Sequence, residues 1–315
     1  MEMKQKDVAE LLLLAALWGA SFLFIRYAVP DFGPFALIMV RVVFASVLLL
    51  PILMLRKQLH EFRANWFHSC CVGLFSSAIP FVLFAFAMMN VSSGFAAILN
   101  TSTPIWGAII AYFWLGDKLT YTRMTGLFIG VVGVMVLVWG KLDFGSSGLG
   151  WSLLAVIGAT VFYGISASYA KRFLKGVPPL VTAAGSQIGS SVALLPLGLL
   201  FWPEVNPSQA SWIAAIILGF VSTGFAYILY FRLIERVGPT NAITVTYLIP
   251  LFAAVWGYFL LDESVTLRMI LGAGTIFLEQ RLLRDWSSSV NARRPRRVRK
   301  VDSRVLNVAS EKVRR

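Results

Sequence analysis

Charged residues are scarce in this sequence. Asp, Glu, Lys and Arg make up 14% of its 315 residues, whereas soluble domains hold about 25%. Hydrophobic residues make up 58% of the chain, and the mean hydropathy is +0.75. This composition excludes an ordinary water-soluble domain and is typical of a chain whose helices are surrounded by lipid.

Cysteine and histidine are almost absent. The two cysteines, Cys70 and Cys71, are adjacent and provide no disulfide framework. The two histidines, His60 and His68, flank a loop, and neither an HExxH nor a GxSxG motif occurs. A nucleophile with its base and a metal with its ligands are therefore both missing. We expect no enzymatic activity, no cofactor and no bound metal.

Acidic residues are missing from the middle of every apolar segment. Glu10, Asp117, Glu235, Asp262 and Glu263 all fall at segment ends or in loops. A proton-driven antiporter for cations needs a buried titratable carboxylate, so the sequence disfavours that mechanism. Glu10 is interpreted as an interfacial charge, and ion coupling through it is the alternative.

Positive charge is abundant, since the net charge is +13. Much of the excess lies after residue 280, and the rest lies mainly in short loops between apolar segments. Alternate connections carry the basic residues: Lys4 and Lys6; Arg56, Lys57 and Arg63; Lys118 and Arg123; Lys171, Arg172 and Lys175; Arg232 and Arg236; and the tail. Basic loops orient membrane helices. We therefore expect both termini in the cytoplasm and no nucleic-acid partner.

Apolar segments separated by short polar breaks predict an all-α membrane protein with ten transmembrane helices. The predicted spans are 8–28, 33–55, 68–90, 93–115, 123–140, 149–171, 180–202, 211–232, 239–261 and 267–283. The first nine have about 18 to 23 residues, and about 20 are needed to cross the hydrocarbon core. The tenth is short, because polar residues begin at Glu279. A truncated or frameshifted end would explain it.

An internal repeat relates the two halves of the chain. Residues recur 146 positions later in matching order: Pro104, Tyr112, Phe113, Leu115, Thr120 and Gly126 as Pro250, Tyr258, Phe259, Leu261, Thr266 and Gly272. Each repeat contains five predicted helices, so the second must enter the membrane in the opposite orientation. The predicted domains are an inverted pair, 8–140 and 149–283, followed by a disordered basic cytoplasmic tail, 284–315.

Several short motifs carry a family resemblance. They are Leu17-Trp18-Gly19-Ala20-Ser21-Phe22, Arg41, Asn100-Thr101-Ser102-Thr103-Pro104, Leu115-Gly116-Asp117-Lys118-Leu119-Thr120, Tyr247-Leu248-Ile249-Pro250 and Leu261-Asp262-Glu263-Ser264-Val265-Thr266. Over about residues 8–275 the chain resembles the ten-span, EamA-type branch of the drug/metabolite transporter superfamily. The resemblance implies movement of small metabolites across the bacterial inner membrane, often export of amino acids, related compounds or toxic analogues. It also implies that spans one to four of each half line a cavity.

Arg41 is the leading candidate for a functional residue. It lies about eight residues into its span, roughly 12 Å deep at 1.5 Å per residue. A cation there costs about 3 kcal/mol, so we expect it to face a cavity, a partner or a group of carbonyls. The functional interpretation is recognition of a carboxylate or phosphate by the guanidinium fork. The alternative is a structural arginine that bonds helix-end carbonyls or extends to the interface.

Prolines at matching positions in the fourth and ninth spans mark the other candidates. Pro104 and Pro250 are predicted kinks, which free backbone groups near a transport site. The further predicted substrate-binding residues are Trp18, Gly19, Asn100, Thr101, Tyr163, Tyr227, Tyr230, Asn241, Thr244 and Tyr247. The alternatives are helix packing for Trp18 and Gly19 and interfacial anchoring for the tyrosines.

Together these features predict a secondary transporter that exports small metabolites, such as amino acids or related compounds, by alternating access. Its expected partners are a small-molecule substrate and membrane lipids. The alternatives are a multidrug or cation efflux carrier and a membrane scaffold without transport activity.

Overall fold

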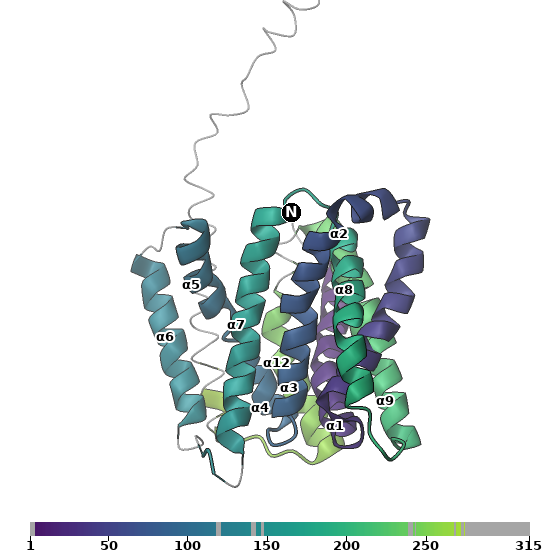
Figure 1. Ribbon diagram of the computed structural model, residues 1–315. Coiled ribbons are helices and arrows are strands. Elements are labelled where there is room, and N and C mark those ends of the chain that lie inside the picture. The colour runs from purple at the N-terminus through teal and green to yellow at the C-terminus, as the bar shows by residue number, and fades with distance from the viewer. Residues whose placement is uncertain are drawn as a thin grey trace, which may run out of the picture.

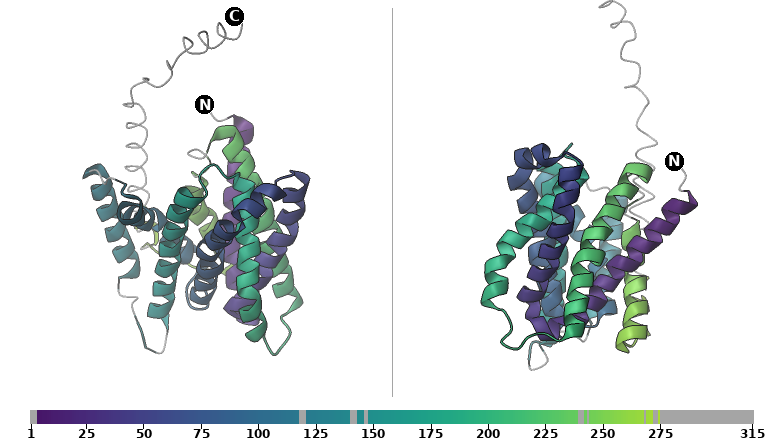
Figure 2. Two further views of the ribbon diagram at one scale, coloured as in Figure 1. Left: turned by 45° about the horizontal axis from the view of Figure 1, so that its top comes forward. Right: turned by 90° about the vertical axis from the view of Figure 1, so that its right-hand side faces the viewer.

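The computed structural model describes residues 4–117, 121–139, 143–145, 148–238, 242, 244–267, 269–271 and 274, and these contain helices and no strand. The helices stand side by side in one bundle (Figure 1). We call the end of the bundle at which the chain begins the N face, and the opposite end the far face (Figures 1 and 2). This arrangement confirms the predicted all-helical fold.

Most helices run from one face to the other. In chain order they are α1 (Gln5–Leu55), α2 (Leu59–Gly73), η1 (Leu74–Ala78), α3 (Ile79–Ala87), α4 (Ser93–Asn100), α5 (Thr103–Leu115), α6 (Tyr121–Val138), α7 (Leu149–Phe173), α8 (Pro179–Leu200), α9 (Gln209–Gly219), η2 (Phe220–Phe225), α10 (Ala226–Val237) and α12 (Val245–Leu261). The elements η1 and η2 are π-helical turns that continue α2 into α3 and α9 into α10.

The long helix α1 contains two of the predicted spans. Its 51 residues would reach about 77 Å at 1.5 Å per residue, more than twice the hydrocarbon thickness. The backbone leaves the helical conformation at Gly33 (φ 71°, ψ 164°), a conformation that glycine adopts without steric penalty. Pro30 and Pro34 flank this position and each removes a helical hydrogen bond. We call the residues before Gly33 the first arm of α1 and those after it the second arm.

Six helical stretches among the described residues are long and apolar enough to cross a membrane. They are Gln5–Leu55, Leu59–Ala87, Ser93–Leu115, Leu149–Phe173, Pro179–Leu200 and Gln209–Val237. Two shorter apolar helices, Met124–Val138 and Val245–Leu261, match the fifth and ninth predicted spans. Most of the tenth predicted span, 267–283, and the whole tail, 284–315, lie outside the described residues.

The two halves run in opposite directions. The first arm of α1 begins at the N face, whereas its counterpart α7 begins at the far face (Figure 1). The π-helical turns obey the same internal relation, since η2 starts 146 residues after η1. Such turns are rare and often lie at functional sites. Both of them border the cavity described below.

Two glycines at matching positions allow helices to pack backbone against backbone. Gly73 precedes η1, and a Cβ at Gly73 would overlap the backbone of Ser186 in α8. Gly219 precedes η2, and a Cβ there would lie 2.9 Å from the carbonyl oxygen of Arg41. Small residues permit this close approach between helices in membranes. The glycines therefore set the distance of η1 from α8 and of η2 from the second arm of α1.

A leucine at Gly73 should strongly destabilise the protein, because its side chain would have to displace the backbone of α8. Overpacking of this kind costs about 1–3 kcal/mol or more. The matched control is Gly158→Ala, whose Cβ would meet Leu83 Cδ1 at an ordinary 3.5 Å. Size-exclusion chromatography after heating in detergent should give a lower melting temperature for Gly73→Leu alone. Equal temperatures for both variants would contradict this packing.

Candidate functional site

A cavity of about 430 Å³ lies between the two halves of the bundle. Its volume falls within the range of small-molecule sites, about 300–1,000 Å³. Residues from both repeats line it: Trp18, Ser21, Phe22, Ile25, Arg41, Ser76, Phe81, Phe84, Ala97, Asn100, Thr101, Thr103, Pro104, Gly107, Tyr163, Gly164, Ala167, Thr223, Tyr227, Thr246 and Ile249.

The cavity is closed toward the far face and open toward the N face. Ile25 and Phe84, which line its far-face side, are each only 3% exposed. Pro104, Ala167 and Thr246, which line it at mid-depth or nearer the N face, are all exposed. The far-face side of the cavity is therefore the more buried one in this conformation.

Arg41 supplies the only ionised side chain among the described residues that line the cavity. Its Nε donates a hydrogen bond to Thr223 Oγ1 at 2.9 Å, and its Cζ lies 3.6 Å from the ring centroid of Phe81. The Thr223 hydroxyl in turn donates to the carbonyl of Leu218 at 2.7 Å, five residues earlier, in the wider turn of η2. Thr223 thus contacts the Nε edge of the guanidinium, and the Phe81 ring contacts one of its faces. No described residue accepts from its two terminal amino groups.

The second repeat places a neutral amide where the first places this cation. Gln187 follows Arg41 by 146 residues, and its Nε2 donates to Ser77 Oγ of η1 at 2.9 Å, as Arg41 does to Thr223. Gln187 is fully buried, and its Oε1 has no partner among the described residues. The two repeats therefore form matching hydrogen bonds at these positions, but only the first repeat supplies a charge. The repeat offset of 146 residues is the sequence signal that could have identified this pair.

Aromatic side chains form much of the cavity wall. Trp18 and Tyr163, 145 residues apart, occupy matching positions in the two repeats, as do Phe81 and Tyr227, 146 residues apart. Trp18 meets Tyr227 edge to face, with ring centroids 6.3 Å apart. Aromatic rings provide apolar contact area. The wall suits a ligand that has an apolar part as well as a charged one.

The fourth span is interrupted beside the cavity, as the proline at 104 predicted. α4 ends at Asn100, and α5 begins at Thr103 with Pro104 in its first turn. The Thr101 hydroxyl donates to the carbonyl of Ile98 at 2.5 Å, and the Thr103 hydroxyl donates to that of Asn100 at 2.7 Å. The Thr103 hydroxyl thus satisfies a carbonyl at the interruption, while the carbonyl of Ile98 also accepts the backbone N–H of Thr101 at 3.0 Å.

Pro250, the other predicted kink, does not interrupt its helix. α12 is one uninterrupted helix from Val245 to Leu261 and contains Pro250. The proline lies near the start of the helix, where only the carbonyl of Thr246 loses its i+4 donor. A proline close to a helix start disturbs few hydrogen bonds, so the helix continues through it.

The other predicted site residues fall into three groups. Trp18, Arg41, Asn100, Thr101, Tyr163 and Tyr227 line the cavity. Gly19, Tyr230, Thr244 and Tyr247 do not: a Cβ on Gly19 would lie 2.7 Å from Phe252 Cβ in α12, and Tyr230 packs 5.2 Å from Trp18. Asn241 lies outside the described residues. The sequence interpretation missed, among others, the lining residues Phe22, Phe81, Phe84 and Thr223.

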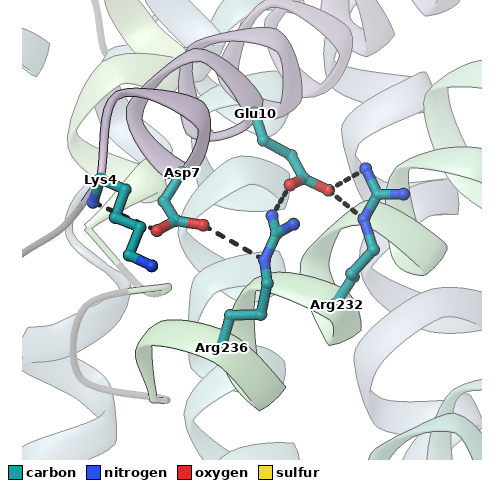
Figure 3. Close-up of polar contacts among 5 residues, drawn as sticks. All are labelled: Lys4, Asp7, Glu10, Arg232 and Arg236. Carbon is teal, nitrogen blue, oxygen red and sulfur yellow. Dashed lines mark hydrogen bonds and ion pairs between the residues drawn. The ribbon is translucent and has the colours of Figure 1, made fainter.

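A cluster of ion pairs joins α1 to α10 at the N face (Figure 3). Asp7 lies 3.2 Å from Arg236 Nε, and Glu10 accepts a hydrogen bond from Arg232 Nε at 2.5 Å. Arg236 also pairs with Glu10. The carboxylate side chains are only 10% and 7% exposed. Glu10 is therefore a buried, doubly paired group and not the simple interfacial charge that we expected.

Removing the charge of Glu10 should destabilise the contact between α1 and α10. Breaking a buried ion pair costs about 3–5 kcal/mol of stability. The arginines are 56% and 41% exposed, and solvent screening reduces that cost. We therefore expect a loss of about 1–2 kcal/mol in the free energy of unfolding. Glu10→Gln should thus lower the melting temperature in detergent. Glu235→Gln, which changes an exposed carboxylate on α10, should leave the melting temperature unchanged. Equal melting temperatures for both would show that the cluster contributes nothing.

Comparison with known proteins places this geometry in a family. The profile of the EamA-like transporter family matches the chain twice, at residues 8–139 and 150–279. An uncharacterized transporter of Archaeoglobus fulgidus is 26% identical over 275 residues, which cover 85% of this chain and 95% of that protein. The uncharacterized transporter YoaV of Bacillus subtilis is 24% identical and covers 85% of this chain. Protein PagO of Salmonella typhimurium is 26% identical and covers 88%.

A solved crystal structure also has a similar fold. It matches with a TM-score of 0.63 over 91% of this chain and 99% of its own chain. The sequence identity is 17%, so the likeness shows the fold alone.

Proposed function

The chain belongs to the EamA-like transporter family and is a multi-pass membrane transporter, and we propose that it carries small metabolites with an anionic group, such as amino acids or related compounds. The observation that carries this proposal is the guanidinium of Arg41 in the cavity wall. Its terminal amino groups have no acceptor among the described residues. A carboxylate can accept both of their hydrogen bonds in the fork geometry that arginine favours.

The charge balance of the cavity supports an anionic or zwitterionic substrate over a cation. No carboxylate occurs among the described residues that line it, whereas a buried cation needs an opposite charge nearby. The aromatic wall of Trp18, Phe81 and Tyr163 provides the surface for an apolar side chain. These properties disfavour the multidrug or cation carrier that the sequence left as an alternative.

The mechanism that we propose is alternating access across the bacterial inner membrane. Basic residues gather at the N face, among them Arg56, Lys57, Arg63 and Lys175, which supports a cytoplasmic N face and N-terminus under the positive-inside rule. The cavity is open on the same side, as the loading conformation of an exporter must be. Two repeats of opposite orientation can exchange conformations and open the cavity to the other side.

Solute counterflow in proteoliposomes tests this function. Vesicles loaded with one amino acid, organic anion, nucleoside or organic cation at a time should accumulate the labelled form of an amino acid or an organic anion. Arg41→Ala should lower the initial rate at least tenfold, because a carboxylate loses about 1.4 kcal/mol or more when its charged partner is removed. Arg41→Lys should restore only part of the rate, since lysine lacks the fork.

The matched control is Arg63→Ala, which removes an exposed arginine far from the cavity and should leave the rate unchanged. Each variant is compared at equal amounts of monodisperse, reconstituted protein. Counterflow of organic cations alone, unaffected by Arg41→Ala, would overturn the proposed substrate class. Absence of flux for every solute with folded protein would overturn the proposed function itself.

A further inference from the structure

Two acidic residues occupy the same local structure in the two repeats. α5 ends in Gly116 with φ 68°, and α12 ends in Asp262 with φ 52°. The next residue is Asp117 in the first repeat and Glu263 in the second. Each donates its backbone N–H to the carbonyl six residues earlier, at 3.2 and 3.1 Å. The backbones thus present both carboxylates in the same way, at opposite faces of the bundle.

The two carboxylates nevertheless have different partners. Glu263 contacts the start of the neighbouring helix α4, where it accepts from Ser93 N at 2.8 Å, Ser93 Oγ at 2.7 Å and Gly94 N at 3.3 Å. Asp117 instead pairs with Lys171 of the neighbouring α7 at 2.7 Å. Both members of that pair are substantially exposed, at 36% and 60%. Exposed pairs of this kind contribute little to stability and separate readily.

Arg26 and Lys171, basic residues at matching positions, also have different partners. Arg26, in the first arm of α1, donates to the carbonyls of Met88 and Met89 at the end of α3, the latter at 3.0 Å. Basic groups are favourable at a helix C-terminus, where carbonyls lack helical partners. Lys171 follows Arg26 by 145 residues, but its described partner is Asp117 alone.

These contacts lie between two groups of helices that the cavity separates. The first group consists of the first arm of α1, α10 and α12, which share an apolar cluster around Leu14, Leu229 and Val245. The second consists of α3, α4, α5 and α7, in which α7 packs against the other three. Glu263 and Arg26 bridge the groups at the far face, where the cavity is closed. Asp117 and Lys171 bond within the second group at the N face, where it is open.

We propose that Arg26 and Glu263 form a latch that holds the far face closed, and that Lys171 is the corresponding latch residue of the N face. In the opposite conformation Lys171 leaves Asp117 and donates to carbonyls of the last turn of α10, at Ile234 and Glu235. These residues follow Met88 and Met89 by 146 positions. This inference rests on the alternating access proposed above and assigns residues to its closing steps.

The surroundings of α10 suit this exchange. Its two arginines, Arg232 and Arg236, are neutralised by Asp7 and Glu10 (Figure 3), so they oppose the approach of Lys171 less than free cations would. The hydrogen-bond donors available to the acidic residue, Glu263 or Asp117, differ between the two repeats. The residue that matches Ser93 is Pro239, which has neither an N–H nor a hydroxyl to donate. The far-face latch therefore has more hydrogen bonds available, which favours the N-face-open conformation found here.

Distances between spin labels test the latches without any transported solute. Labels are placed at Phe86→Cys in α3 and Phe259→Cys in α12, both exposed near the far face, in a Cys70→Ser, Cys71→Ser background in liposomes. Double electron–electron resonance should give one main distance for this background. Glu263→Gln and Arg26→Gln should each raise the population of a longer distance at least threefold. Asp31→Asn, which changes a far-face carboxylate that bonds Ser208, is the matched control.

The same labels test the N-face latch. Adding Lys171→Gln to Glu263→Gln should reduce the longer-distance population toward the background value, because the far-open conformation loses its own latch. Lys175→Gln, an exposed lysine at the same face, should have no such effect. Distributions for Glu263→Gln and Arg26→Gln that match Asp31→Asn would overturn the far-face latch. An unchanged population on adding Lys171→Gln would overturn its N-face counterpart. Neither result depends on whether the proposed substrates are carried.

Discussion

One buried cation determines the chemistry of the cavity. Arg41 is only 5% exposed and lies within an apolar helical bundle, where an unpaired guanidinium is costly. The protein offsets part of this cost with the Thr223 hydroxyl and the ring of Phe81. The Thr223 contact depends on backbone features, since Thr223 lies in η2 and Gly219 lets η2 pack against the arm that carries Arg41. The remaining donors of the guanidinium have no acceptor among the described residues, and on them the proposed function depends.

The inverted repeat explains why this charge stands alone. Gln187 occupies the matching place and forms the matching hydrogen bond to η1, but it brings no charge. Duplication therefore supplied a symmetric frame, and divergence of one position made one side of the cavity cationic. The same frame relates the polar contacts at the two faces. Asn90 donates to Ser152 at 3.0 Å at the far face, where the symmetry places the counterparts of Arg236 and Asp7.

Periodicity and duplication were enough to predict the helical fold, because a helix in lipid must satisfy its own backbone and must be apolar over its length. Periodicity also placed Arg41 at mid-depth in its span, and Arg41 lines the cavity together with the candidates Trp18 and Tyr163. Periodicity and duplication could not predict η1 and η2, since a single extra residue in a turn does not visibly change the apolar periodicity. Thr223, which lies in η2, was missed for that reason, and the uninterrupted course of α12 through Pro250 depends on where the helix begins.

The central claim is that Arg41 binds an anionic group of the carried solute. The most direct test is the affinity of the purified protein, by isothermal titration calorimetry in detergent, for the amino acid that gives the fastest counterflow and for its carboxamide. The carboxamide should bind at least tenfold more weakly to the unchanged protein, and the two should bind about equally to Arg41→Gln. Equal affinities of the acid and the amide for the unchanged protein would contradict this claim.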